Sequence, residues 1–155
     1  MKASAKHGGI FRGKDTGADE WLYGWYVGDD RPAYKDEAYI FPRWDMVGSV
    51  APSAYKVDKD SVGQFTGFTD SNGKDIYDGD IIQVNGKPYH QIKWLDEIGG
   101  FGLCNLATKR QLSRWPDRCL FGIPAQDWWK EFSREIVVVG NVFDNPDYLE
   151  KFVEP

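Results

Sequence analysis

The stretch that decides the fold runs from residue 63 to residue 94 and reads GQFTGFTDSNGKDIYDGDIIQVNGKPYHQIKW. It contains two Asn-Gly pairs, Asn72-Gly73 and Asn85-Gly86, each flanked by residues typical of β-strands. Asn-Gly accommodates the positive φ angles that a tight hairpin turn needs. The pattern therefore predicts hairpin turns at both pairs, with strands over 63–68, 81–84 and 89–94.

Outside this stretch, further segments have strand-like patterns. Residues 21–27, WLYGWYV, place aromatic side chains on both faces of a strand, so we expect this strand to be covered on both sides. Residues 136–142 form the most β-branched run, and its continuous apolar character predicts a central strand. Shorter strands are predicted at 38–41 and 101–104.

Helical signals are few. Asn145-Pro146-Asp147 combines an N-cap residue, a first-turn proline and a first-turn acid, so a closing helix of about two turns is predicted from Asp147 to Phe152. A short helix near 124–132 is one interpretation of a second segment, where Pro124 is acceptable in the first turn. The composition agrees with a mainly β chain, because aromatic residues make up 15% of the sequence and it contains 17 glycines.

Length and charge exclude several classes of protein. A chain of 155 residues with 41% apolar residues can form a core of its own, and we assign residues 9–155 to a single domain behind a flexible lead at 1–8. The formal net charge of −5 gives no overall signature of nucleic-acid or membrane binding. The N-terminus lacks the apolar stretch of a signal peptide, and the run at 136–139 is far too short to span a membrane. A cytoplasmic location is expected.

The sequence contains two cysteines, Cys104 and Cys119, and neither belongs to a Cys-x-x-Cys pair. Disulfides are rare in reducing compartments, so both residues are predicted to be free thiols. Together with His7 and His90 they make no spacing typical of a zinc site. No metal and no other cofactor is therefore predicted.

Three blocks of the sequence occur together, in the same order, in one known family. The most specific is VGQFTGFTDSNGKDIYDGDII at 62–82, and the others are FRGK at 11–14 with EWLYG at 20–24, and VGNVFDNPDYL at 139–149. They are similar to the patterns of the YopX family of phage and prophage proteins. Asp78 stands where members of that family usually carry Glu.

This resemblance covers residues 11 to 149 and carries implications about fold and origin. It implies a β-rich fold with a small barrel-like antiparallel core, and a phage or prophage source. Residues 104–133 match no part of the family pattern and are interpreted as a member-specific insertion. The resemblance implies no activity.

Turn and core geometry explain the residues of these blocks without a functional site. Gly73 and Gly79 lie where a positive φ is favourable only for glycine. Asp70 and Asp80 are placed to accept backbone N–H bonds at a turn and at the start of a strand. A bulge is predicted at Gly140-Asn141, with the Asn amide bonded to the backbone. The fold signature therefore comprises Gly67, Asp70, Gly73, Gly79, Asp80, Gly140 and Asn141.

Acidic residues between positions 70 and 80 are the first candidates for chemistry. Asp70, Asp75, Asp78 and Asp80 are close in sequence and could converge on a divalent cation, but they lack the spacing of a calcium loop. Solvated turn acids are the simpler interpretation, and no metal site is assigned.

A metal-dependent nuclease is one alternative. Asp80, followed across a hairpin by Gln91-Ile92-Lys93, has the outline of a site where a metal and a lysine meet at a phosphate. A second strong acid is missing from this outline. Gln91 and Lys93 are equally explained as the polar face of a strand.

The segment 109–118, KRQLSRWPDR, is the local exception to the acidic charge of the chain. Its cations could contact phosphates while its tryptophan stacks on a base. The alternatives are a solvated loop or a subunit contact that also uses Trp128 and Trp129. The residues assigned to this weak nucleic-acid or protein contact are Lys109, Arg110, Arg114, Trp115 and Arg118.

These observations favour a non-catalytic, phage-encoded binding protein that associates with itself. A host or phage protein partner is left open, and no membrane partner is expected. The alternatives are a nucleic-acid-associated protein that uses residues 109–118 and a nuclease centred on Asp80 and Lys93.

Overall fold

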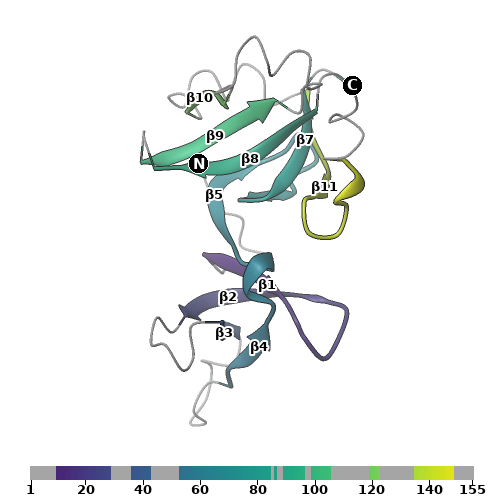
Figure 1. Ribbon diagram of the computed structural model, residues 1–155. Coiled ribbons are helices and arrows are strands. Elements are labelled where there is room, and N and C mark those ends of the chain that lie inside the picture. The colour runs from purple at the N-terminus through teal and green to yellow at the C-terminus, as the bar shows by residue number, and fades with distance from the viewer. Residues whose placement is uncertain are drawn as a thin grey trace. The chain divides into compact units, whose positions relative to one another are not determined.

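The computed structural model describes residues 10–28, 36–42, 53–84, 86, 89–96, 99–105, 119–122 and 135–148. The chain divides into two compact units, Met1–Gly67 (unit 1) and Phe68–Pro155 (unit 2). Antiparallel strands dominate the described part of each unit (Figure 1). The prediction of a mainly β chain with antiparallel strands is confirmed. The single domain over 9–155 stays a prediction.

Unit 1 is built on strands paired in the order β4-β3-β2-β1-β5, and the order continues from β5 to β6 of unit 2. A short 3-10 helix, Lys59–Ser61, joins β4 to β5, and the Asp58 side chain caps it by accepting the Asp60 N–H at 2.9 Å. The strands are β1 (Phe11–Lys14), β2 (Trp21–Gly28), β3 (Ala38–Pro42), β4 (Tyr55–Val57) and β5 (Gly63–Thr69).

Unit 2 contains a five-stranded sheet in the order β10-β9-β8-β7-β11. The turn before β7 and the hairpin that joins β7 to β8 contain Gly79 and Gly86, whose φ angles are 88° and 71°. The strands of this unit are β6 (Asp75–Tyr77), β7 (Asp80–Val84), β8 (Tyr89–Leu95), β9 (Gly100–Asn105), β10 (Cys119–Gly122) and β11 (Ile136–Asn141).

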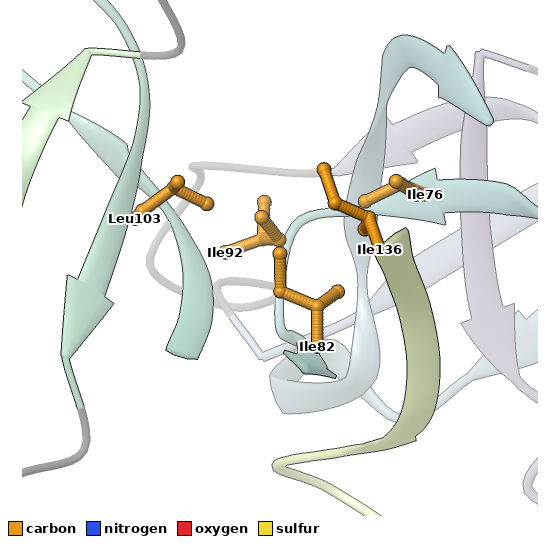
Figure 2. Close-up of a cluster of buried hydrophobic side chains, with 5 residues drawn as sticks. All are labelled: Ile76, Ile82, Ile92, Leu103 and Ile136. Atoms are coloured by element: carbon orange, nitrogen blue, oxygen red, sulfur yellow. The ribbon is translucent and has the colours of Figure 1, made fainter. Parts of the chain in front are cut away.

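Aliphatic side chains from different strands form the core of unit 2. Ile82, Ile92 and Leu103 lie on one face of the sheet, because the register sets Ile92 opposite Leu103 and residues two apart share a face. Ile76 and Ile136 complete the cluster, and Figure 2 shows the five side chains directed toward one another. Full burial of each isoleucine stabilises the fold by about 1.5–3 kcal/mol.

A second, separate core lies in unit 1. Ala38, Ile40 and Val57 are buried there, on one face of the strands β3 and β4. A Cβ added to Gly13 would lie 2.8 Å from Val57 Cγ2, so only glycine lets β1 approach this core so closely. The partly buried side chains that pack against the cluster are Phe11, Leu22, Tyr26 and Val62.

The barrel-like core implied by the resemblance is wrong, because the sheets of the described residues are open. One strand order runs from β4 to β6 and the other from β10 to β11. A barrel needs its first and last strands to pair, and these do not. Each unit instead buries a cluster of apolar side chains on a sheet face.

The central position predicted for residues 136–142 is also wrong. β11 is an edge strand that pairs only with β7 within the described part of the sheet. The edge of β11 that faces away from β7 is covered by a turn, in which the Ser71 N–H donates to the Ile136 carbonyl at 2.9 Å. An apolar run can therefore lie at a sheet edge when another segment protects that edge.

The predicted helices fall largely outside the described residues. The predicted closing helix is not shown, because the described residues end at Tyr148, whose N–H donates to the Asn145 carbonyl at 3.1 Å. Residues 149–152 and 124–132 lie outside the described ranges. Within those ranges, no helix has the length and apolar character needed to cross a membrane.

The prediction of two free thiols is wrong. Cys104 is disulfide-bonded, and Cys119 is the only other cysteine of the sequence. The antiparallel register of β9 and β10 sets Cys104 opposite Cys119. Residues directly opposite on neighbouring strands are close enough for a bridge, which spacing along the chain does not reveal.

Candidate functional site

The candidate site is the sheet face of unit 1 that points away from its core. Residues 21, 23, 25 and 27 alternate along β2 with the core-facing Leu22 and Tyr26. The register continues this face onto β3, where Phe41 lies opposite Trp25 and Tyr39 lies opposite Val27. We call this surface the aromatic face, and it consists of Trp21, Tyr23, Trp25, Val27, Tyr39 and Phe41.

The far end of β2 exposes this face to solvent. Trp25 is 44% exposed and Val27 is 49% exposed, although β2 has hydrogen-bonded neighbours on both sides. The expectation that β2 is covered on both sides is therefore wrong at these positions. A large exposed aromatic on an ordered sheet indicates a contact surface, because its burial by a ligand removes apolar area from water.

Cations lie beside the aromatic rings at neighbouring strand positions. The Arg12 guanidinium carbon is 4.6 Å from the centre of the Trp21 ring, and Lys14 Nζ is 5.4 Å from it. Both cations share the aromatic face, because Arg12 lies opposite Tyr23 and Lys14 lies opposite Trp21. Arg12 is buried, so its guanidinium makes a cation–π contact with the Trp21 ring and does not present its charge to solvent.

Flanking carboxylates pair with the lysines of this surface. Lys14 Nζ is 2.9 Å from Asp19 Oδ1, and the Asp19 side chain is 96% exposed. On β4, Lys56 lies opposite Tyr39, and its Nζ is 3.8 Å from Glu37 Oε1. The Tyr39 hydroxyl donates to Glu37 Oε2 at 2.7 Å. The Lys14 side chain is only 13% exposed, whereas the Lys56 side chain is 53% exposed, so the Lys56–Glu37 pair is the more accessible and contributes little to stability.

The carboxylates considered for metal binding have another role. Asp70, Asp75 and Asp80 are buried, so their interpretation as solvated turn acids is wrong. Asp80 Oδ2 accepts the Tyr77 N–H at 2.8 Å, which places this acid where the turn pattern predicts it, at the start of β7. Among the described residues, no group of three or more His, Cys, Asp or Glu side chains could hold a metal ion.

Asp70 connects its own turn to the edge of β11. Its Oδ1 accepts the N–H groups of Asn72 at 2.8 Å and Lys74 at 2.9 Å, and its Oδ2 accepts the Val138 N–H at 3.0 Å. The Ser71 hydroxyl adds a bond to the Ile136 carbonyl at 2.5 Å. This turn therefore satisfies backbone groups of an edge strand that is 65 or more residues away.

The remaining signature residues lie in a strand, a turn and a bulge. Gly67 and Gly73 have φ angles of 88° and 77°, in the region that favours glycine. The register of β11 against β7 shifts between Val138 and Gly140, which is the bulge that the pattern predicts. Asn141 Oδ1 accepts the N–H groups of Phe143 at 3.0 Å and Asp144 at 2.8 Å.

Comparison with known proteins identifies the family. The family model described as YopX protein matches residues 10–150. The chain belongs to the YopX family. No curated protein matches the sequence.

A solved structure shares the fold of this YopX-family chain. It is titled "Crystal structure of protein EF1440 from Enterococcus faecalis", with 21% sequence identity and a TM-score of 0.50. The match covers 90% of this chain and 96% of that one. At this identity the likeness shows the fold alone.

The structure does not bring together the residues of the nuclease outline in this YopX-family chain. Asp80 shares the core face of β7 with Ile82, whereas Lys93 lies on the other face of β8 and is exposed. His90 is buried on the core face, opposite Ile82.

Other predicted contact residues lie outside the described ranges. They are Lys109, Arg110, Arg114, Trp115 and Arg118, as well as Trp128 and Trp129. His7, which was considered for a zinc site, also lies outside these ranges. The segment 104–133, interpreted as an insertion, is described only at 104–105 and 119–122.

Sequence reasoning missed the aromatic face as a site. The signal was present in the alternation of Trp21, Tyr23 and Trp25, with Arg12 and Lys14 on the preceding strand. Because Leu22 and Tyr26 are also apolar, the pattern alone did not distinguish a face turned to solvent from a covered one.

Proposed function

We propose that this protein acts by binding a partner rather than by catalysing a reaction, and that it uses the aromatic face. The observation that carries the proposal is the exposure of Trp25 and Val27 on a strand with neighbours on both sides. Tryptophan, tyrosine and phenylalanine are enriched at the centres of interfaces, where they contribute much of the binding energy. Asp70 and Asp80 support the non-catalytic part of the proposal, because their carboxylates accept hydrogen bonds from backbone N–H groups.

Retention of a partner in host cells tests this proposal. Tagged wild type, a Trp25→Ser/Val27→Ser double variant and Trp94→Ser are purified side by side, and the retained protein and nucleic acid are quantified. Trp94 is a matched control, since it is 41% exposed but lies in unit 2. We expect wild type and Trp94→Ser to retain the same partner and the double variant to lose it.

Equal retention by all three proteins would contradict the proposed surface. Metal-dependent nicking of a plasmid by the wild type, abolished in Asp80→Asn, would contradict the proposal of a binding protein without catalytic activity. Melting curves of the variants serve as the control for folding.

Self-association is a second candidate for the same surface. Val27 favours it, because an exposed aliphatic side chain beside Trp25 suits a self-complementary contact between two copies. Sedimentation velocity of the wild type is then expected to show an oligomer that the double variant lacks. Phage origin and a cytoplasmic location stay predictions.

A further inference from the structure

We propose that the aromatic face binds single-stranded nucleic acid. This inference rests on the proposed function, since it names the occupant of the same surface. Two properties of the face point to this ligand: aromatic rings follow one another on neighbouring strands, and the charged side chains at the strand positions of the face are cations. A ligand with exposed flat rings and regularly spaced negative charges complements both properties.

The rings are arranged for stacking. Trp25 and Phe41 are a directly opposed cross-strand pair, and Tyr39 lies opposite Val27 on the same face. Side chains opposed in this way have Cβ atoms about 4.5–5.5 Å apart, which is close enough for neighbouring rings to share one apolar surface. Trp25, 44% exposed, presents the largest of these rings to solvent. Unpaired bases stack on such rings, whereas the bases of a duplex are already stacked on each other.

The charges of the face suit phosphates. Lys56 lies on β4 opposite Tyr39, and its side chain is 53% exposed. Lys14 lies at the other end of the face, opposite Trp21. Their carboxylate partners, Glu37 at 3.8 Å and Asp19 at 2.9 Å, lie outside the strands. A phosphate can replace Glu37 on Lys56 at low cost, because this ion pair is exposed and contributes little, whereas the Lys14 side chain is only 13% exposed.

A second copy of the chain is the other candidate occupant of this face, and the same charges make it less favoured than a nucleic-acid strand. A two-fold contact sets a surface against itself, so the lysines of both copies would lose water together. Removing charges from water is costly unless each charge gains a well-placed partner. A nucleic-acid strand supplies such a partner at each nucleotide.

Fluorescence anisotropy with labelled oligonucleotides tests the inference directly. The probe is a single strand of about 20 thymidines, longer than the roughly 4–16 nucleotides that such sites cover, and the comparison is a duplex with the thymidine strand paired to adenosines. We expect the single strand to bind more tightly than the duplex. Loss of one stacked base costs about 1–3 kcal/mol, so Trp25→Ser is expected to weaken binding about 5- to 150-fold. Trp94→Ser is the matched control and is expected to bind like wild type.

Salt dependence tests the role of the lysine. Removing one phosphate contact lowers the slope of log affinity against log salt by about 0.7 for a single strand. Lys56→Gln is therefore expected to show that change. The matched control, Lys93→Gln, removes an exposed lysine of unit 2 and should leave the slope unchanged.

The outcomes separate this inference from the proposed function. Absence of oligonucleotide binding, equal losses in Trp25→Ser and Trp94→Ser, or a slope unchanged by Lys56→Gln would overturn the inference. If the wild type does not bind the oligonucleotide but its double variant loses a protein partner or dissociates from an oligomer, the proposed function stands without this ligand. If neither oligonucleotide nor any other partner depends on the face, both fail.

Discussion

At the scale of single residues, buried carboxylates act as fixed acceptors for backbone N–H groups. Asp80 is 1% exposed, and its Oδ2 accepts the N–H of Tyr77 from the strand before the Gly79 turn. A hydrogen bond to a charged acceptor is worth about 1.5–3 kcal/mol, and burial raises the cost of disturbing it. The acids of the 70–80 stretch therefore stabilise the turns of unit 2.

Asp80→Asn is expected to lower the free energy of unfolding by about 1–3 kcal/mol, because the amide keeps one acceptor oxygen but loses the charge. Urea denaturation provides the measurement. The matched control is Asp78→Asn, since the bond that Asp78 Oδ1 accepts from the Trp94 N–H is long, at 3.3 Å, and lies at an exposed site. Its loss should stay within about 0.5 kcal/mol. Similar losses in the two variants would contradict a special role for Asp80.

Gly79 gives a second prediction at this scale. Its φ is 88°, and an added Cβ would lie 3.6 Å from Val142 Cγ2, which is ordinary contact. The cost of Gly79→Ala is therefore backbone strain rather than a clash, and we expect about 1–2 kcal/mol of lost stability. Gly17→Ala is the control. A Cβ added at Gly17 would lie 3.4 Å from Asp15 Oδ1, and the φ of Gly17 is not in the left-handed region. Thermal melting that shows no difference between the two would refute the strain argument.

At the scale of elements, the 70–74 turn and β11 depend on each other. The turn is local in sequence, but its Asp70 and Ser71 satisfy backbone groups of β11. An edge strand with free N–H groups can pair with another chain, so this contact also protects unit 2 from unwanted association. The turn thus has a tertiary role in addition to reversing the chain.

Asp70→Ala tests this dependence. The variant loses the acceptor of three N–H groups, including that of Val138, so amide hydrogen exchange at Val138 is expected to accelerate strongly, with a stability loss of about 2–3 kcal/mol. Ser71→Ala removes only the hydroxyl bond to Ile136 and should cost about 0.5–1 kcal/mol. An unchanged exchange rate at Val138 in Asp70→Ala would show that the edge is protected in another way.

At the scale of the whole molecule, the described residues contain two separate cores. Ile40 belongs to the cluster of unit 1 and Ile92 to that of unit 2, and both side chains are fully buried. Each cluster holds few fully buried side chains, so the stability of each unit depends strongly on every one of these side chains. The aromatic face lies on the sheet that covers the unit 1 core, and its rigidity therefore depends on that core.

Ile40→Ala and Ile92→Ala form a reciprocal pair of variants. Each is expected to lower stability by about 2–5 kcal/mol, through lost burial and the cavity that remains. Hydrogen exchange should accelerate first in β2 and β3 for Ile40→Ala, and in β7 and β8 for Ile92→Ala. Identical exchange patterns in the two variants would instead indicate one cooperative domain, as the sequence predicts for 9–155.

The strands and turns of this protein were predictable because their causes are local. The Asn-Gly pair at 72–73, the alternation of residues 21–27 and the acid at position 80 act over a few residues, and each feature lies where the pattern predicts it. The YopX resemblance was equally accessible, because its blocks are contiguous in the sequence.

Tertiary structure alone decided which surfaces are covered. Alternation shows that Trp25 and Tyr26 lie on opposite faces of β2, but only the pairing of distant strands shows that the Trp25 face is exposed. The edge position of β11, the burial of Asp70 and the bridge at Cys104 have the same origin. Each depends on which segment packs beside another, and that choice reflects the burial of apolar area summed over the whole chain rather than the preference of any short stretch.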